Sequence, residues 1–273
     1  MGNLYIVGTP IGNLEDITFR AVRVLREVSL IAAEDTRKAR ILLEHYDIKT
    51  PVTSFFAGNE RRKAAVILTA LAQGDVALIS EAGMPTISDP GYPLVATVTE
   101  AGGTVIPIPG PSAHTTALVA SGLPTDRFLF LGFLPRKSQA LTTALEELVA
   151  IPETLICYES PRRVRNLLQQ LLAVLGNRPV ALCRELTKRY EDIWRGELAG
   201  VLSHLDEQAP RGEFTIVVGG ASRDSAERWD TEQVLTALNA ARDSGLSHSQ
   251  AAREVAQRSG WQRGEVYDLA ISG

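Results

Sequence analysis

Short apolar runs alternate with amphipathic stretches along most of the chain. Runs of about four apolar residues bounded by glycine, proline or charge predict buried strands. In the first half, such runs lie at residues 4–7, 30–33, 52–56, 76–79 and 105–108. Apolar residues recur at helical spacing in the segments that begin at Asp16, Ala39, Asn59, Leu94 and Ser112. This alternation predicts an α/β fold with a mostly parallel sheet covered by helices.

The alternation resumes after residues 122–126, where the composition shifts. A second α/β unit is predicted from strands at residues 128–133, 154–158, 179–183 and 213–218. Its best-defined helix has Ser160 as the expected cap, Pro161 in the first turn, and a stripe of leucines that stops at Gly176. Residues 184–189 follow a predicted strand and are expected to form a loop.

A polar segment at residues 221–230 predicts a linker, and three short helices are expected after it, at 231–244, 247–259 and 263–271. Helices joined by short glycine turns fit a helix-turn-helix nucleic-acid module, and equally a small docking bundle. From Thr231 onward, four arginines stand against five acidic residues, a weak balance for a phosphate binder. We therefore predict three parts: an N-terminal α/β domain (1–122), a second α/β domain (123–221), and a linker with a helical module (222–273).

Three predicted strands end in loops rich in glycine, proline and serine. We call GTPIGN (8–13) the first loop, SEAGMPTISDPGYP (80–93) the second and PGPSA (109–113) the third. Ligands of α/β proteins bind at the carboxyl ends of strands, and loops of this length are usually functional. Gly83 and Gly91 would let the backbone approach a ligand closely. We expect the three loops to form one cleft; ordinary surface turns are the alternative.

Composition narrows the class of protein. The chain has 273 residues, 45% of them hydrophobic, which is enough for two domains or one large one. A net charge of −4 argues against a generally basic nucleic-acid coat but leaves room for a local basic patch. Cys157 and Cys183 lie in apolar runs and are expected to be buried thiols rather than a disulfide. We see no signal peptide and no apolar run of about 20 residues, so a soluble cytoplasmic protein is expected.

The sequence lacks the motifs of several common kinds of functional site. There is no P-loop and no GxGxxG fingerprint. The histidines show no spacing typical of metal ligands, so no metal is expected. Ser112 follows Gly110 and Pro111, but the segment does not fit the GxSxG of a nucleophile elbow, which disfavours a serine hydrolase.

Charged residues gather where the strands of the second unit end. They are Arg136, Lys137, Glu159, Arg162, Arg184, Glu185 and Lys188. If these strand ends share one rim, the cations could hold a polyanion. Arg163, Arg165 and Arg189 are expected instead to solvate helix faces.

Eight segments of the chain resemble, in this order, motifs of the ribosomal RNA small-subunit methyltransferase I family: GTPIGNLEDIT, AEDTR, SEAGMPTISDPGYPLV, PGPSA, GFLPRK, YESPRR, RELTK and GEFTIVV. This family belongs to the tetrapyrrole-methylase-like (class III) methyltransferases. The resemblance covers essentially the whole chain. It implies two α/β domains with the cofactor cleft between them, usually as a homodimer. It also implies methyl transfer from S-adenosylmethionine to the 2′-hydroxyl of a cytidine in the decoding region of 16S rRNA, within the small ribosomal subunit.

The resemblance also implies site residues. It places S-adenosylmethionine, and the product S-adenosylhomocysteine, against Pro10, Ser80, Ala82, Gly83, Pro85, Ile87, Ser112, Ala113, Tyr158 and Leu186. A ribose hydroxyl is a poor nucleophile, so a base or a pKa-lowering cation would help the reaction. The candidates for this catalytic role are Glu81, Arg162, Glu185 and Lys188. The candidates for RNA binding are Arg136, Lys137, Arg162 and Arg184.

The chain departs from the family pattern at two places. Glu81 stands where members commonly have Asp, and residues 55–58 read Phe-Phe-Ala-Gly where members often carry histidines. Two other functions stay open. A C-methylase of a precorrin-type tetrapyrrole would share the fold and cofactor, but such enzymes generally lack the helical tail. A non-enzymatic RNA-binding protein of ribosome assembly would leave the three cleft-forming loops unexplained.

Overall fold

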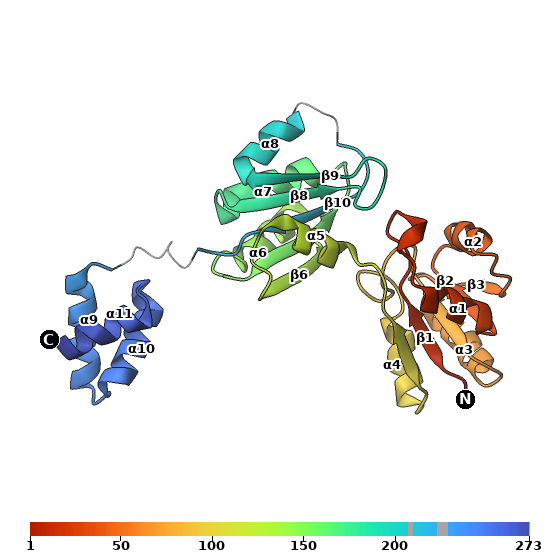
Figure 1. Ribbon diagram of the computed structural model, residues 1–273, viewed down its shortest axis with the longest axis horizontal. Coiled ribbons are helices and arrows are strands. Elements are labelled where there is room, and N and C mark those ends of the chain that lie inside the picture. Colours follow the sequence, from red (N-terminus) through yellow and green to blue (C-terminus); the bar gives the residue numbers. More distant parts are fainter. Residues whose placement is uncertain (207–209, 223–228, 273) are drawn as a thin grey trace. The chain divides into compact units, whose positions relative to one another are not determined.

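The computed structural model describes residues 1–206, 210–222 and 229–272 (Figure 1). The chain forms two compact units, one of Met1–Glu146 and Thr154–Gly219 and the other of Glu147–Glu153 and Gly220–Gly273. The larger unit holds two five-stranded sheets, and the smaller unit holds a group of three helices. The segment at 221–230 that was predicted to be a linker lies mostly outside the described residues. The three-part division of the chain stays a prediction.

The first sheet is parallel throughout. It consists of β1 (Leu4–Val7), β2 (Leu30–Ala33), β3 (Val52–Ser54), β4 (Val76–Ile79) and β5 (Val105–Ile108), in the order β3-β2-β4-β1-β5. All four neighbouring pairs run parallel, which confirms the predicted sheet type. The carboxyl ends of these strands therefore share one edge, and the three glycine-rich loops leave from it.

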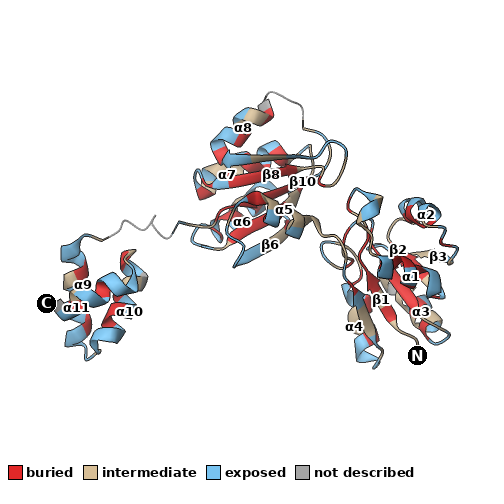
Figure 2. Ribbon diagram, viewed as in Figure 1, coloured by how far each residue is buried: buried red, intermediate tan, exposed pale blue. Residues whose placement is uncertain are grey.

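Helices cover both faces of this sheet. The helical segments are η1 (Leu14–Asp16), α1 (Phe19–Glu27), α2 (Thr36–His45), α3 (Glu60–Leu71) and α4 (Tyr92–Glu100). Successive residues of a strand point to opposite faces. Ala77 and Ile79 of β4 accordingly join the core under α1 and α2, whereas Val76 and Leu78 join the core under α3 and α4. All four residues of β4 are buried, and the neighbouring strand β1 is also mostly buried (red in Figure 2).

The second sheet is mostly antiparallel. Its strands are β6 (Phe128–Phe133), β7 (Thr154–Glu159), β8 (Pro179–Arg184), β9 (Asp192–Glu197) and β10 (Phe214–Val218), in the order β6-β7-β10-β8-β9. Only the β6–β7 pair runs parallel. Helix α5 (Ala113–Ser121) starts at the third loop but packs on this sheet, because Ala117 and Leu118 share a core with Ile156 and Val217.

Three further helices complete the larger unit: α6 (Ser138–Glu146), α7 (Val164–Leu175) and α8 (Leu198–Asp206). The leucine stripe of α7 is buried, and the helix ends at Gly176 as predicted. The predicted cap at Ser160 is wrong. The Ser160 carbonyl accepts hydrogen bonds from the amides of Arg163 and Val164 in a turn, and the helix begins only at Val164.

The smaller unit has its own apolar core. Its helices are α9 (Thr231–Asp243), α10 (His248–Ser259) and α11 (Arg263–Ser272), which confirms the three predicted helices. Capping boxes begin α9 at Asp230 with Gln233 and α10 at Ser247 with Gln250. Core residues from all three helices pack together: Val234, Leu238, Ala241, Ala251, Ala252, Val255, Val266 and Ala270.

The two cysteines are free and buried, as predicted. Burial raises the pKa of the Cys157 thiol to about 12, and the same cause raises the pKa of Cys183 to about 12. Among the described helices, none combines the length and the apolar character needed to cross a bilayer.

Candidate active site

A cavity of about 350 Å³ lies where the loops of the first sheet face the second sheet. The first, second and third loops all contribute to its wall, together with the end of β7, the start of β10 and the segment after β8. The lining residues are Ile11, Glu81, Ala82, Gly83, Met84, Ile87, Ser88, Asp89, Ser112, Ala113, Phe133, Tyr158, Glu159, Ser160, Pro161, Cys183, Leu186, Glu213, Phe214 and Thr215.

Backbone contacts hold the three loops together. Thr9 and Gly83 form an isolated antiparallel bridge, with N···O distances of 2.9 and 3.0 Å. Gly8 and Gly110 approach so closely that a Cβ on Gly8 would lie 2.7 Å from the Gly110 Cα. At Gly12, a Cβ would lie 3.0 Å from the Leu186 carbonyl oxygen, so the first loop also touches the segment after β8. The predicted single cleft is therefore present, and close glycine contacts make it possible.

Two segments beside the cavity contain strained backbone. Thr86 and Ser88 in the second loop have φ of 74° and 63°, and Glu185 and Thr187 after β8 have φ of 51° and 66°. Non-glycine residues in this region cost roughly 1–3 kcal/mol each, and such residues concentrate at ligand sites. Thr86 and Ser88 flank Ile87, which lines the cavity. The backbone that positions this part of the cavity wall is therefore strained.

A hydrogen-bonded group of side chains forms another part of this wall. Ser112 Oγ lies 2.8 Å from His114 Nδ1, and Tyr158 Oη accepts a hydrogen bond of 3.1 Å from the His114 amide. The His114 ring stacks on Phe130 with centroids 4.4 Å apart. Burial lowers the pKa of His114 and raises that of Tyr158. The imidazole is therefore neutral near pH 7, and it keeps Ser112 and Tyr158 in place.

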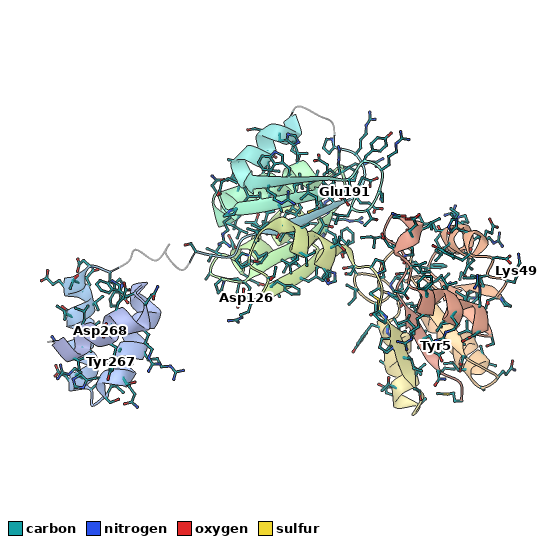
Figure 3. The ribbon with its side chains drawn as sticks, viewed as in Figure 1. Tyr5, Lys49, Asp126, Glu191, Tyr267 and Asp268 are labelled. Carbon is teal, nitrogen blue, oxygen red and sulfur yellow. The ribbon has the colours of Figure 1, made fainter. Side chains whose placement is uncertain are left out.

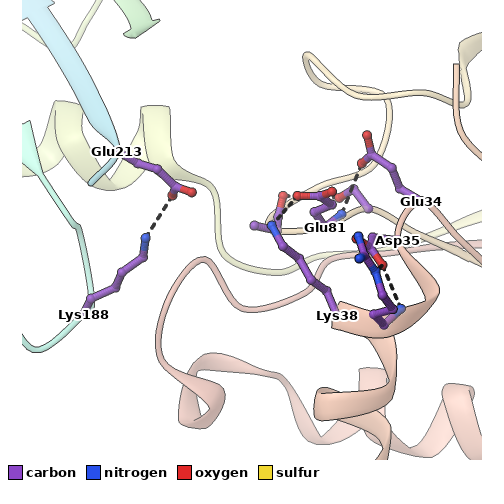
Figure 4. A network of polar contacts seen from close by, with 9 residues as sticks. Glu34, Asp35, Lys38, Glu81, Lys188 and Glu213 are labelled. Carbon is purple, nitrogen blue, oxygen red and sulfur yellow. Dashed lines mark hydrogen bonds and ion pairs between the residues drawn. The ribbon is translucent and has the colours of Figure 1, made fainter. Parts of the chain in front are cut away.

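Most charged groups around the cavity are paired (Figure 4). Lys38 of α2 forms an ion pair with Glu81. Lys188 Nζ lies 2.8 Å from Glu185 Oε1 and 3.0 Å from Glu213 Oε2. Burial would lower the pKa of Lys188, but its hydrogen bonds with the two carboxylates raise it overall. Lys188 is therefore a protonated amine held between two acids.

The expectation that Arg163 solvates a helix face is wrong, because Arg163 pairs with the buried Glu159 carboxylate. Its guanidinium lies 3.2 Å from Glu159 Oε2 and donates a 3.0 Å hydrogen bond to the Pro135 carbonyl. The Glu159 side chain is only 1% exposed. Its other carboxylate oxygen accepts a 2.7 Å hydrogen bond from the Ser160 amide.

Asp89 differs from the other acids of the site. Burial raises its pKa, the charges of Glu34 and Glu81 raise it further, and a hydrogen bond with Ser80 works in the opposite direction. The resulting pKa is about 7. Asp89 was not among the site residues predicted from the sequence, although it lies in the second loop directly before Pro90 and Gly91. The sequence feature that could have identified Asp89 is an acidic residue within a proline- and glycine-rich loop at the end of a strand.

Most of the predicted cofactor residues lie together. Those that line the cavity are Ala82, Gly83, Ile87, Ser112, Ala113, Tyr158 and Leu186. Pro10 and Ser80 instead line a neighbouring cavity of about 120 Å³ beside Lys38 and Glu81. Pro85 belongs to neither set of lining residues.

The predicted catalytic and RNA-binding residues are more dispersed. Of the catalytic candidates, Glu81 lines the cavity, Glu185 and Lys188 pair just behind it, and Arg162 is exposed. Arg136 and Lys137 are also exposed. Arg184 is half-buried and lies 3.7 Å from Asp192.

The cavity wall is acidic. Four carboxylates line it, and no lysine or arginine is among the lining residues that the structure describes. Apolar side chains such as Ile11, Ile87 and Leu186 make up much of the remainder. Such a wall suits a ligand with cationic groups and an apolar or aromatic part, and it does not suit phosphate groups.

Comparisons with known proteins identify the family of the chain. The profile of the tetrapyrrole (corrin/porphyrin) methylases matches residues 3–202. A protein of Halalkalibacterium halodurans called ribosomal RNA small subunit methyltransferase I is 44% identical, over 98% of this chain and 94% of its own. The protein of that name from Escherichia coli O157:H7 is 44% identical, over 99% of this chain and 95% of its own.

Solved structures show the same fold. A uroporphyrin-III-C-methyltransferase from Thermus thermophilus has a TM-score of 0.57 at 22% identity, covering 80% of this chain and 94% of its own. A diphthine synthase has a TM-score of 0.62 at 14% identity, covering 80% of this chain and 90% of its own. At these identities the likeness concerns the fold alone.

Proposed function

Because the chain belongs to the tetrapyrrole methylase family and, within it, to the ribosomal RNA small subunit methyltransferase I family, we propose that it methylates 16S rRNA, at the 2′-hydroxyl of a cytidine in the decoding region, with S-adenosylmethionine as methyl donor. The observation that carries the proposal is similarity to relatives of that name over nearly the whole chain. A C-methylase of tetrapyrroles is the second candidate, favoured only by the shared fold.

The cavity residues fit S-adenosylmethionine. This molecule carries an ammonium group and a sulfonium but no phosphate, and the acidic wall suits those cations. We propose that the backbone of Ala82, Gly83 and Ala113 hydrogen-bonds its polar groups, while Ile87 and Leu186 contact its apolar parts. Bound there, the cofactor supplies an electrophilic methyl group. Pro10, Ser80 and Pro85 would support this wall from behind.

The protein's main contribution would be alignment of the hydroxyl with the methyl group, which can lower a barrier by several kcal/mol. Among the four catalytic candidates, Glu81 is favoured for direct contact because it lines the cavity. Glu185 and Lys188 are better described as positioning residues, since they bond to each other and lie beside Gly12 of the first loop. Arg162 is exposed and free to meet the RNA.

We propose that Arg136, Lys137 and Arg162 contact RNA phosphates, because all three are exposed near the ends of β6 and β7. Arg184 would also bind RNA if its guanidinium left Asp192 and paired with a phosphate instead. A homodimer, cytoplasmic location and two α/β domains at 1–122 and 123–221 complete the proposal. The helices of 231–272 would serve RNA contact or docking.

One experiment tests the reaction, the substrate and the atom together. Small ribosomal subunits from cells that lack this protein are incubated with it and radiolabelled S-adenosylmethionine, and the labelled nucleoside is then identified. We expect the label in 2′-O-methylcytidine. Thermal unfolding with and without the cofactor is the companion measurement, since a ligand that binds the folded state raises Tm.

The other outcomes point to other functions. No label in RNA combined with a cofactor-dependent rise in Tm would favour the tetrapyrrole C-methylase. No label and no rise in Tm would favour a non-enzymatic RNA-binding protein.

A further inference from the structure

We infer that Asp89 is the general base that removes the proton from the attacking ribose hydroxyl. The inference rests on the proposed methyl transfer to a ribose, and it goes beyond it by assigning the base to a residue that the family resemblance did not indicate.

Among the described residues, Asp89 alone of the cavity acids lacks a paired cation. Four carboxylates line the cavity, those of Glu81, Asp89, Glu159 and Glu213. Glu81 pairs with Lys38, Glu159 with Arg163 and Glu213 with Lys188. Within the described parts of the chain, Asp89 has no such ion pair. A neighbouring cation stabilises a carboxylate and weakens it as a base, so the lack of such a partner favours Asp89 for this role.

Two of the groups that face Asp89 strengthen this effect, because Glu34 and Glu81 contribute negative charge that raises its pKa. Ser80 contributes a hydrogen bond that lowers the pKa, and Tyr158 contributes a neutral phenol from β7. Lys38 lies near Glu34 and forms an ion pair with Glu81. Burial and these charges bring the pKa of Asp89 to about 7. A base is most effective when its pKa lies near the working pH, because it is then both deprotonated and strong.

The backbone holds Asp89 in a fixed position. Thr86 and Ser88, just before it, have positive φ, and Gly91, just after it, has φ of 129°. The Gly91 amide donates a 2.8 Å hydrogen bond to Glu60 of α3. A Cβ at Gly91 would lie 2.6 Å from the Leu78 side chain, so this turn packs against β4. A base on such a constrained segment needs little reorganisation to meet a hydroxyl.

The proton and electrons of the step balance. The Asp89 carboxylate accepts the hydroxyl proton while the ribose oxygen forms its bond to the methyl carbon. The methyl–sulfur bond breaks and its electron pair stays on sulfur, which leaves a neutral thioether. Protonated Asp89 then returns its proton to water.

The test compares Asp89→Asn with Asp126→Asn, which alters an exposed aspartate of the same unit (Figure 3). We expect Asp89→Asn to lower the single-turnover methylation rate about 10²–10⁴-fold, the usual contribution of a general base. Its affinity for S-adenosylmethionine and for the small subunit should change less than about threefold. The wild-type and Asp126→Asn rates should rise with pH through a midpoint near 7, and Asp89→Asn should lose this dependence.

A readout independent of activity accompanies the kinetics. In protein labelled with ¹³C at the aspartate carboxyls, the Asp89 signal, assigned by its loss in either Asp89→Asn or Asp89→Glu, should titrate near pH 7. If Asp89→Asn fails to bind the cofactor, Asp89→Glu replaces it in the rate measurement and should keep the pH dependence. The inference is overturned if Asp89→Asn keeps both its rate and its pH profile, if Asp89→Glu loses the pH dependence, if Glu81→Gln alone abolishes the profile, or if Asp89 titrates near 4. Failure of the proposed function looks different, because the wild type itself would then leave ribose unmethylated.

Discussion

Replacement of Arg163 should destabilise the larger unit through the carboxylate that it leaves behind. In Arg163→Met, Glu159 keeps its hydrogen bonds with Ser160 but loses the cation that the described residues place on its other oxygen, at a side chain that is 1% exposed. Breaking a buried ion pair by removing one partner costs about 3–5 kcal/mol. Arg163 itself is 28% exposed, so water can partly replace it, and we expect about 2–4 kcal/mol. For a unit of this size, about 3 kcal/mol lowers Tm by roughly 6–12 °C.

The assay is thermal and urea unfolding followed by circular dichroism. The neighbouring Arg162→Met is the matched control, because Arg162 is exposed and its replacement should change stability by less than about 0.5 kcal/mol. Glu159→Gln combined with Arg163→Met should recover part of the loss, since a buried neutral amide needs no cation. The reasoning fails if Arg163→Met stays within about 1 kcal/mol of wild type, or if the double variant is no more stable than Arg163→Met.

Three further predictions test other parts of the structure. Gly8→Ala would push the first loop away from Gly110, so it should lower the stability by about 1–3 kcal/mol and weaken cofactor binding. The control Gly264→Ala, whose Cβ meets no atom within 4 Å, should change neither stability nor cofactor binding. Equal effects of the two variants on Tm would contradict the close contact between Gly8 and Gly110. Removal of Thr231–Gly273 should weaken RNA binding and spare cofactor affinity, because the helices have their own core; calorimetry that shows lost cofactor binding would refute this separation. Cys157 and Cys183 should resist a thiol reagent at pH 8 until urea unfolds the protein, since burial keeps the pKa of each near 12; rapid labelling of the native protein would contradict their burial.

Most of the strands could be predicted from short apolar runs in the sequence. Strands β1, β2, β4, β7, β8 and β10 consist largely of buried apolar residues, and all were predicted. Strand β9 was missed because it lies at the edge of the second sheet, where most of its residues are exposed or half-buried and its sequence, DIWRGE, lacks a simple alternation. The pairing of β9 with β8 is a tertiary contact, and a local sequence pattern does not predict it.

The site was less predictable than the fold. Glycines and small residues that line the cavity were found from their loops and the family resemblance. Asp89 and Arg163 were not, because their importance depends on burial and on partners that are distant in sequence. Glu34 and Ser80 act on Asp89, and Glu159 is buried only once β7 takes its place in the sheet. A carboxylate's strength as a base is a property of the folded surroundings.

The strand order of the first sheet has a consequence for synthesis on the ribosome. Strand β1 leaves the ribosome first, yet both of its partners come much later: Leu4 pairs with Val76 in β4 and with Val105 in β5. At about 5–20 residues per second, the roughly 70 residues of translation that separate β1 from β4 take on the order of 4–14 s. During that time β1 has neither of its neighbours. The growing chain therefore passes through a period in which its apolar N-terminal segment needs protection from aggregation, and slower elongation would prolong it.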